Sequence, residues 1–474
     1  MLYVLAAIVL STTLVCETAA KRGWLPYWVS RKILHIVAVG ACAVATTTVE
    51  HRLLIPIVAV AEVALVGLVA SGSLMRDETG RPAWGIIWFP LAFLLLLISK
   101  LDPAIAAFSM WTLAICDPAA TITGKLLSKD TYQLTGDQKS LPGNVAFLIS
   151  FILLYLFLGP EIEAVTLTAV CMLGIILAAA EAVGSKGLDN LTVPLFTAFL
   201  LHALASSPID PVALLLFVVF TSLIGMLPRI RRSLTGGGIV TAALLALVVM
   251  VGSRGVEWLL PLVLFFGSSV LVGKLFPGAT KGGDEKQKQA RNATQVLANG
   301  GVYGLIILSW HYPIEPIREI SHNPISPFLL LSATAIATAD TWSSEVGQHY
   351  RSKTYNLLTW QAISPGLSGG ISLPGTLAGL AGAAFIGFTC YWLLPYPSVG
   401  AFILITLFGF AGMLIDSLLG ALLQAKYEDP ETGAITDASG HDKKLVAGFR
   451  WMTNDLVNFL AILIGVWLAT YLYW

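Results

Sequence analysis

Residues 401–416 read AFILITLFGFAGMLID, which is fifteen uncharged residues followed by an aspartate. A helix needs about twenty predominantly apolar residues to cross the hydrocarbon core of a bilayer. Runs of this kind, or slightly shorter ones, alternate with polar loops from one end of the 474-residue chain to the other. Because only helices and closed barrels satisfy all their backbone hydrogen bonds inside lipid, this alternation predicts a helical protein that crosses the membrane many times.

The composition excludes an ordinary soluble protein. Apolar residues make up 56% of the chain and charged residues only 12%, whereas soluble domains carry about 25% charged residues. The formal net charge is zero and no face rich in Lys, Arg and aromatic residues stands out, so we expect no nucleic-acid partner. The cysteines lack the spacing of a zinc site and are interpreted as reduced packing residues: Cys16, Cys42, Cys116, Cys171 and Cys390.

The predicted fold class is all-α, a polytopic integral membrane protein with about sixteen transmembrane helices. The first apolar run has no basic start, and Lys21 and Arg22 follow it, which favours a retained span over a cleaved signal peptide. The spans are expected to begin near Leu2, Ile33, Leu53, Trp84, Ala104, Val145, Ala164, Val193, Val212, Ile239, Trp258, Thr294, Phe328, Thr376, Ala401 and Leu456.

The distribution of basic residues predicts the orientation. If the N-terminus lies outside the cytosol, all but four of the 28 Lys and Arg residues fall in cytosolic loops, as the positive-inside rule requires. The exceptions are Arg52, Lys100, Arg254 and Arg318. No Arg-rich transit segment precedes the first span, which favours the inner membrane of a prokaryote. The polar motifs described below then lie at cytosolic helix ends.

The basic and glycine-rich stretch 228–238, PRIRRSLTGGG, predicts a boundary between two membrane domains, residues 1–232 and 233–474. The halves share short patterns. Asp117 stands seven residues before a glycine, as Asp340 does, and SLPGNVA from Ser140 recurs as SLPGTLA from Ser372. Both a diverged duplication and a chance match in apolar sequence remain open at this point.

The first half carries residues suited to phosphoryl transfer. The stretch 116–125, CDPAATITGK, contributes a carboxylate and a lysine, and 139–143, KSLPG, contributes a second lysine. Carboxylates can hold Mg²⁺, lysines offset phosphate charge and glycines let the backbone approach. The phosphate-loop pattern GxxxxGK[ST] is absent, because Ala119 and Leu126 break it. Each residue alone could instead be a helix cap or an interfacial lysine.

A further acidic pair follows in this half, at Glu181 and in the stretch 187–194, GLDNLTVP. The candidate catalytic residues of the first half are therefore Asp117, Lys125, Lys139, Ser140, Glu181, Asp189 and Asn190, with Gly124 and Gly143 at the nucleotide and Asp117, Glu181 and Asp189 at Mg²⁺.

These motifs, together with Arg31-Lys-x-x-His35, resemble the phytol kinase and dolichol kinase family over about residues 25–228. That family is related to the CTP-using phosphatidate cytidylyltransferases. The resemblance implies CTP-dependent phosphorylation of a long-chain isoprenoid alcohol. Arg31, Lys32 and His35 share one helix face, because their spacings are three and four.

The second half has its own polar motifs. RNATQVLANGG, residues 291–301, puts a polar stripe on one helix face, which must face protein and not lipid. SPGLSGG, residues 364–370, is a loop whose backbone amides could cradle phosphates. The candidate catalytic residues are Arg291, Asp340, Glu345, Asp416, Asn454 and Asp455, with Gln295, Asn299, Ser344, Gly366, Ser368, Gly369 and Gly370 at the nucleotide and Asp340, Glu345 and Asp416 at Mg²⁺.

These second-half motifs resemble, over about residues 235–474, the membrane family that includes plant phytyl-phosphate kinase. The resemblance implies that a monophosphate is converted to a diphosphate. Taken together, the two halves predict a bifunctional kinase that uses CTP and Mg²⁺ to convert a prenol such as phytol or geranylgeraniol to its diphosphate. Two alternatives stay open: a cytidylyltransferase in the first half, or a secondary transporter built from two related halves. The oligomeric state is not predicted.

Overall fold

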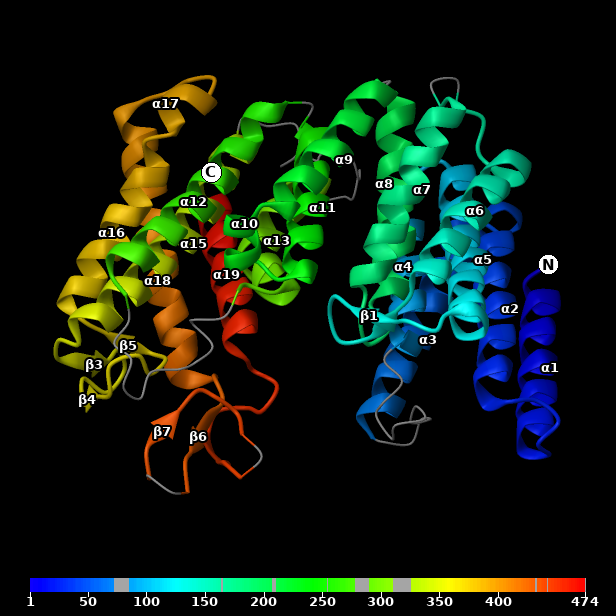
Figure 1. Cartoon of the computed structure of the whole chain (residues 1–474), viewed down its shortest axis with the longest axis horizontal. Coiled ribbons are helices and arrows are strands. Elements are labelled where there is room, and N and C mark those ends of the chain that lie inside the picture. Colours follow the sequence, from blue (N-terminus) through cyan, green and yellow to red (C-terminus); the bar gives the residue numbers. More distant parts are fainter. Residues whose placement is uncertain are drawn as a thin grey trace. The chain divides into compact units, whose positions relative to one another are not determined.

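A computed structural model describes residues 1–71, 85–162, 165–206, 210–253, 255–277, 290–309, 325–430, 433–440 and 442–473. The chain forms two compact units, which divide between Met226 and Leu227 (Figure 1). The expected span starts at Trp84 and Ala164 and the basic residues Arg254 and Arg318 lie outside the described ranges.

The first unit is a bundle of helices with one small hairpin. The hairpin pairs β1 with β2 in antiparallel register and joins two of the helices. The elements are α1 (Leu2–Lys21), α2 (Tyr27–Thr48), α3 (His51–Ala70), α4 (Gly85–Ile98), α5 (Pro103–Leu127), β1 (Tyr132–Gln133), β2 (Gln138–Lys139), α6 (Leu141–Leu158), α7 (Leu167–Val183), α8 (Asp189–Ser206) and α9 (Pro211–Met226).

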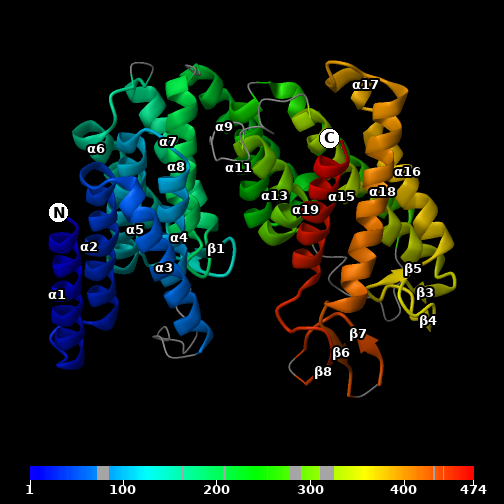
Figure 2. The same ribbon diagram turned by 180° about the vertical axis from the view of Figure 1, so that it is seen from behind.

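The helices of the second unit are α10 (Pro228–Ser233), α11 (Gly236–Ser253), the 3₁₀ turn η1 (Val256–Leu259), α12 (Leu260–Leu275), α13 (Ala293–Ser309), α15 (Ile325–Tyr350), α16 (Leu373–Gly387), α17 (Cys390–Leu393), α18 (Val399–Leu422) and α19 (Asn454–Tyr473). Two antiparallel sheets complete it, in the orders β4-β3-β5 and β7-β6-β8. Both lie at the end of this unit opposite α17 (Figures 1 and 2). Their strands are β3 (Thr354–Asn356), β4 (Ala362–Ile363), β5 (Gly370–Ile371), β6 (Lys426–Glu428), β7 (Ile435–Thr436) and β8 (Lys444–Ala447).

The helical membrane fold is confirmed. Within the described chain, ten helical spans are long and apolar enough to cross a membrane, and α4, α7, α9 and α13 are shorter apolar helices. Two of the remaining long helices, α8 and α15, carry candidate site residues. Each expected span has its helix, but the short strands in the loops were not predicted.

The basic helix α10 directly follows the division between the two compact units. The basic helix α10 belongs to the second unit, where its last residue contacts a distant segment. The carbonyl of Ser233 accepts a hydrogen bond from the Arg291 backbone at 2.9 Å, and the Thr235 amide donates to the Arg291 carbonyl at 3.0 Å. This pairing holds α10 in the second unit and the Arg291 backbone close to the start of α11.

The pattern shared by the halves makes the same local structure in each unit. Ser140 caps α6 by accepting a hydrogen bond from the Gly143 amide at 3.3 Å, and Ser372 caps α16 by accepting one from the Gly375 amide at 3.4 Å. A serine before a Pro-containing first turn is a strong helix start. The shared motif therefore has one structural role in both units.

The glycines of the motif are packing positions. A Cβ on Gly143 would lie 2.9 Å from the Ala120 carbonyl oxygen, and one on Gly375 would lie 2.9 Å from the Ser343 carbonyl oxygen. Ala120 stands three residues after Asp117, as Ser343 does after Asp340. The same glycine thus packs against the same turn of the preceding aspartate-bearing helix in both units, which supports a diverged duplication.

Candidate functional site

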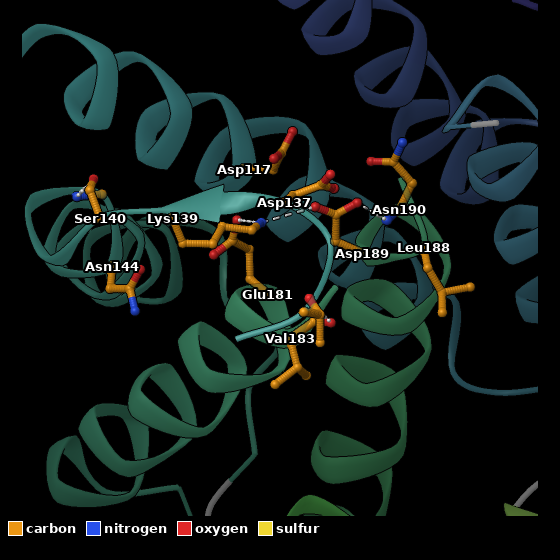
Figure 3. Close-up of polar contacts among 12 residues, drawn as sticks. Asp117, Asp137, Lys139, Ser140, Asn144, Glu181, Val183, Leu188, Asp189 and Asn190 are labelled. Carbon is orange, nitrogen blue, oxygen red and sulfur yellow. Dashed lines mark hydrogen bonds and ion pairs between the residues drawn. The ribbon is translucent and has the colours of Figure 1, made fainter. Parts of the chain in front are cut away.

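Three carboxylates from three helices meet in the first unit. Asp117 comes from α5, Glu181 from the last turn of α7 and Asp189 from the start of α8. One oxygen of each lies within 4.8 Å of the others, and within the described residues no other group of three His, Cys, Asp or Glu side chains meets in this way. Asp117 and Glu181 are buried, and Asp189 is partly exposed. The sequence prediction that these three residues converge agrees with this geometry (Figure 3).

Lys139 joins two of these carboxylates. It ends strand β2, and its Nζ contacts Glu181 and lies 3.3 Å from Asp189 Oδ2 (Figure 3). Burial alone would lower the pKa of this ammonium group, but the charges of Asp189 and Glu181 outweigh burial and raise it above its usual value. Lys139 is therefore a cation at neutral pH, held among the acidic groups.

A second lysine reaches Asp117 from α2. Lys32 Nζ lies 2.7 Å from Asp117 Oδ2, and His35 Nε2 lies 3.5 Å from the same oxygen and 3.3 Å from the Leu113 carbonyl. Neither Lys32 nor His35 is among the candidate site residues that the sequence predicts. Their spacing of three on one helix face was the signal that could have placed them there.

The loop before α8 fixes the position of Asp189. The backbones of Lys186 and Gly187 have φ values of +52° and +76°. The Asp137 carboxylate accepts a hydrogen bond from the Lys186 amide at 2.8 Å. A Cβ on Gly184 would come within 2.6 Å of Asp189 Cβ. The hairpin and this tight turn together present Asp189 to Lys139.

Several predicted site residues of the first unit have other contacts. Lys125 is exposed and its Nζ lies 4.5 Å from the centre of the Trp28 ring. The Asn190 side chain donates to the Gly85 carbonyl at 3.1 Å, which ties α8 to α4. Ser140 is the cap of α6, and a Cβ on Gly124 would lie 2.8 Å from its Oγ. Together with Gly143, these residues support helix packing and do not join the carboxylates.

In the second unit, two carboxyl groups meet directly. The side chains of Asp340 on α15 and Asp416 on α18 share a hydrogen bond. The amide of Asn458, oriented to satisfy its neighbours, donates to Asp416 Oδ2 at 3.1 Å and to the Asn454 carbonyl at 2.9 Å. Two carboxylates in contact repel each other unless they share a proton or hold a cation. The contact explains why Asn458 points into the bundle.

The structure does not bring Glu345 together with Asp340 and Asp416, which the sequence predicts to share one metal site. Five residues of helix separate Glu345 from Asp340, about 140° around the axis, so the two point to different faces. The Glu345 carboxylate lies 3.5 Å from the position of a Cβ on Gly273 of α12. Burial lowers the pKa of the Arg291 guanidinium, and the charge of Glu345 opposes this shift. Glu345 therefore acts as a counter-charge to Arg291.

The polar stripe of α13 is partly structural. The Gln295 side chain accepts from the Asn292 amide, and the Asn292 side chain accepts from the Gln295 amide, both at 3.0 Å, which is a capping box. Asn299 Nδ2 donates to the Gln295 carbonyl at 3.0 Å, and its buried Oδ1 has no hydrogen-bond partner among the residues that the structure describes. Gln295 is thus part of a helix cap, whereas the side-chain oxygen of Asn299 takes no part in it.

The remaining candidates lie in α15, in the first turn of α19 and in the glycine-rich loop. Ser344 and Asn454 are exposed, and Asp455 follows in the first turn of α19. Gly366 and Gly369 have φ values of +91° and +80°, and a Cβ on Gly370 would meet Thr354 at 2.7 Å. Ser368 donates to Asp437, a residue that sequence reasoning missed.

The first-unit cluster suits a hard divalent cation. Carboxylate oxygens are the ligands that Mg²⁺ prefers, and Asp117, Glu181 and Asp189 supply three of them. Lys32 and Lys139 balance part of their charge. Asp340 and Asp416 supply a smaller set of the same donors, with the Asn458 amide beside them.

Lys139→Gln should destabilise the protein, whereas Lys125→Gln should not. Lys139 is mostly buried between Glu181 and Asp189, and removing one partner of a buried ion pair costs on the order of 3 kcal/mol. Lys125 is exposed. Thermal unfolding in detergent gives the unfolding temperature of each variant. Equal unfolding temperatures for Lys139→Gln and Lys125→Gln would contradict the placement of Lys139.

The chain matches the family described as Integral membrane protein DUF92 over residues 219–466. It belongs to this family. The family description names an integral membrane protein. The long apolar helices of both units agree with that description. No match to a solved structure was found.

The chain is also similar to curated proteins from a plant and a cyanobacterium. The chain is 27% identical to Protein PGR of Arabidopsis thaliana, over 54% of this chain and 95% of that protein. It is 27% identical to Protein VTE6, chloroplastic, of the same plant, over 50% of this chain and 65% of that protein. It is also 28% identical to a phytol kinase of Synechocystis, over 41% of this chain and 86% of that protein.

Proposed function

We propose that this protein is a prenol kinase whose first unit transfers phosphate to an isoprenoid alcohol such as phytol or geranylgeraniol. The observation that carries the proposal is the meeting of Asp117, Glu181 and Asp189 with two lysines among membrane helices. The similarity to a protein named phytol kinase supports the same reaction class. An apolar alcohol dissolved in the bilayer and a soluble nucleotide can meet at such a place.

The first unit's residues have distinct roles in this reaction. Asp117, Glu181 and Asp189 would hold Mg²⁺, which, when bound, neutralises charge on the phosphates of the nucleotide. Lys139 and Lys32 stabilise the charge of the transferring group. The alcohol oxygen forms a bond to the γ-phosphorus of CTP while the bond to the β–γ bridging oxygen breaks and CDP leaves. When Asp117 and Glu181 are the Mg²⁺ ligands, Asp189, the least buried carboxylate of the three, accepts the hydroxyl proton.

The second unit is proposed to phosphorylate the resulting monophosphate. Asp340 and Asp416 would hold Mg²⁺, and Arg291 would offset phosphate charge. The resemblance of its motifs to the family that includes plant phytyl-phosphate kinase supports this step. The chain would then be a fusion of two successive kinases, both using CTP at the cytosolic face of an inner membrane. The basic residues support this orientation through the positive-inside rule.

One observation leaves a cytidylyltransferase as the alternative function of the first unit. Its motifs resemble a family related to enzymes that transfer CMP, and the same carboxylate cluster could serve either transfer.

The position of the cluster argues against a transporter. Glu181 and Asp189 lie at helix ends, whereas transporter sites lie near the middle of the membrane on broken helices.

Labelled CTP distinguishes the two transfers. With purified protein, Mg²⁺ and geranylgeraniol, label from the γ-phosphate of CTP should appear in the lipid and CDP should accumulate. Label from the α-phosphate should stay in the aqueous phase. A lipid that carries the α-label together with released pyrophosphate would contradict the kinase proposal for the first unit, and transfer from ATP alone would show that the nucleotide is wrong.

A further inference from the structure

The glycine-rich loop 364–370 holds a carboxylate of its own chain. The Ser368 amide donates to Asp437 Oδ2 at 2.8 Å, and Ser368 Oγ donates to Asp437 Oδ1 at 2.9 Å. Asp437 directly follows β7 in the other small sheet of the second unit. A backbone amide and a hydroxyl that meet the two oxygens of one anionic group form charge-assisted hydrogen bonds, which are also the contacts that proteins make with phosphate.

This contact lies next to the carboxylate pair of the second unit. A Cβ on Gly369 would come within 2.6 Å of Ala421, so the loop lies directly on α18. Ser368 Oγ also lies 3.4 Å from the carbonyl of Gly420. Gly420 stands four residues after Asp416, about 6 Å along the helix axis. A group bound at Ser368 is therefore about one helical turn from the proposed Mg²⁺ ligands.

A buried lysine lies close to Asp437, because Tyr427 of β6 pairs with Thr436 of β7, and Lys426 and Asp437 are the next residues along the two antiparallel chains. Lys426, the first residue of β6, is only 8% exposed. Burial lowers the pKa of its ammonium group, and the charge of Asp437 opposes this shift. Lys426 and the two donors of Ser368 thus provide positive potential around one carboxylate. A phosphate group carries more charge than a carboxylate and has three acceptor oxygens, so it can compete for these donors.

We infer that Ser368 and Lys426 form a phosphate-binding seat, which Asp437 fills in the substrate-free protein and leaves when a phosphorylated substrate binds. The inference rests on the proposed function, because it gives the second unit's phosphorylated substrate a place beside Asp340 and Asp416. The sheet β7-β6-β8 carries Asp437, so displacement of Asp437 also releases the contact of this sheet with the glycine-rich loop.

Calorimetry with inorganic pyrophosphate and the full detergent-solubilised chain tests the seat. Asp437→Asn keeps the side-chain shape but removes the competing charge, so it should bind pyrophosphate about tenfold more tightly than the unmodified protein. Ser368→Ala should bind it more weakly. Asp429→Asn is the matched control, because Asp429 lies in the same sheet region and pairs with Lys443 at 3.9 Å. The affinity of this variant for pyrophosphate should equal that of the unmodified protein.

If folded Asp437→Asn binds pyrophosphate no more tightly than the unmodified protein, the inference is overturned. The contact between Ser368 and Asp437 would then only stabilise the fold. If Asp437→Asn does not fold, the unmodified protein decides the question. Saturating pyrophosphate should increase hydrogen exchange of the Ala438 amide region and of β7, whereas equal or slower exchange there would also overturn the inference.

The seat and the kinase proposal can fail separately. If the second unit is not a monophosphate kinase, Asp437→Asn still tightens pyrophosphate binding, but no diphosphate forms from prenyl monophosphate. If the seat is wrong, diphosphate still forms while Asp437→Asn leaves the affinity for pyrophosphate unchanged.

Discussion

Asp117→Asn should abolish phosphorylation of the prenol while the protein still converts added prenyl monophosphate to the diphosphate. The substitution keeps the shape of a side chain that lies within 4.8 Å of Glu181 and Asp189 but removes its charge. It also leaves Lys32, 2.7 Å away, without its carboxylate. Loss of one such electrostatic contact in an active site lowers the rate by roughly 10²–10³-fold. Thin-layer chromatography of labelled lipids measures both steps.

Asp102→Asn is the matched control for this variant. Asp102 caps the same helix, α5, where its side chain accepts a hydrogen bond from the Ala104 amide at 2.8 Å. Asparagine caps helices about as well as aspartate, so both activities should persist. Loss of both steps in well-folded Asp117→Asn would mean that the two units share one composite site.

Asp340→Asn should produce the opposite defect, with prenyl monophosphate accumulating from the alcohol and no diphosphate formed. Asp340 shares a hydrogen bond with Asp416, and an amide in its place removes one of the two charges proposed to hold Mg²⁺. The expected fall in the second step is again roughly 10²–10³-fold. The measurement is the ratio of monophosphate to diphosphate over time with the alcohol as substrate.

The first step serves as the internal control for Asp340→Asn, because Asp117, Glu181 and Asp189 belong to the other unit. Asp416→Asn should reproduce the same ratio. A variant that forms diphosphate at the normal rate would contradict the assignment of the carboxylate pair to the second step.

The membrane fold could be predicted because the thickness of the bilayer core sets the length of the apolar runs that cross it. Each expected span coincides with a helix, since backbone groups in lipid have few other ways to satisfy their hydrogen bonds. The meeting of Asp117, Glu181 and Asp189 could also be predicted, because charged groups at membrane helix ends need partners. The hairpin that carries Lys139 to them gives no comparable periodic signal.

Several predicted site residues have local contacts that compete with a site role. Lys125 ends a motif that resembles a kinase signature, yet it is exposed above Trp28. Gly124 and Gly143, which the sequence predicts at a nucleotide, also allow two helices to approach. Glu345 lies on the wrong face of α15 for Asp416. Asp437 stands 69 residues from Ser368, and no sequence pattern links the two.

The claim that two separate sites perform successive steps is tested most directly by mixing the two inactive variants. Purified Asp117→Asn and Asp340→Asn proteins are combined in shared detergent micelles with the prenol, Mg²⁺ and γ-labelled CTP. Neither variant alone should form diphosphate from the alcohol, but the mixture should, with the monophosphate appearing first and passing from one protein to the other. A mixture that still forms no diphosphate, although each protein is folded, would contradict two independent sites.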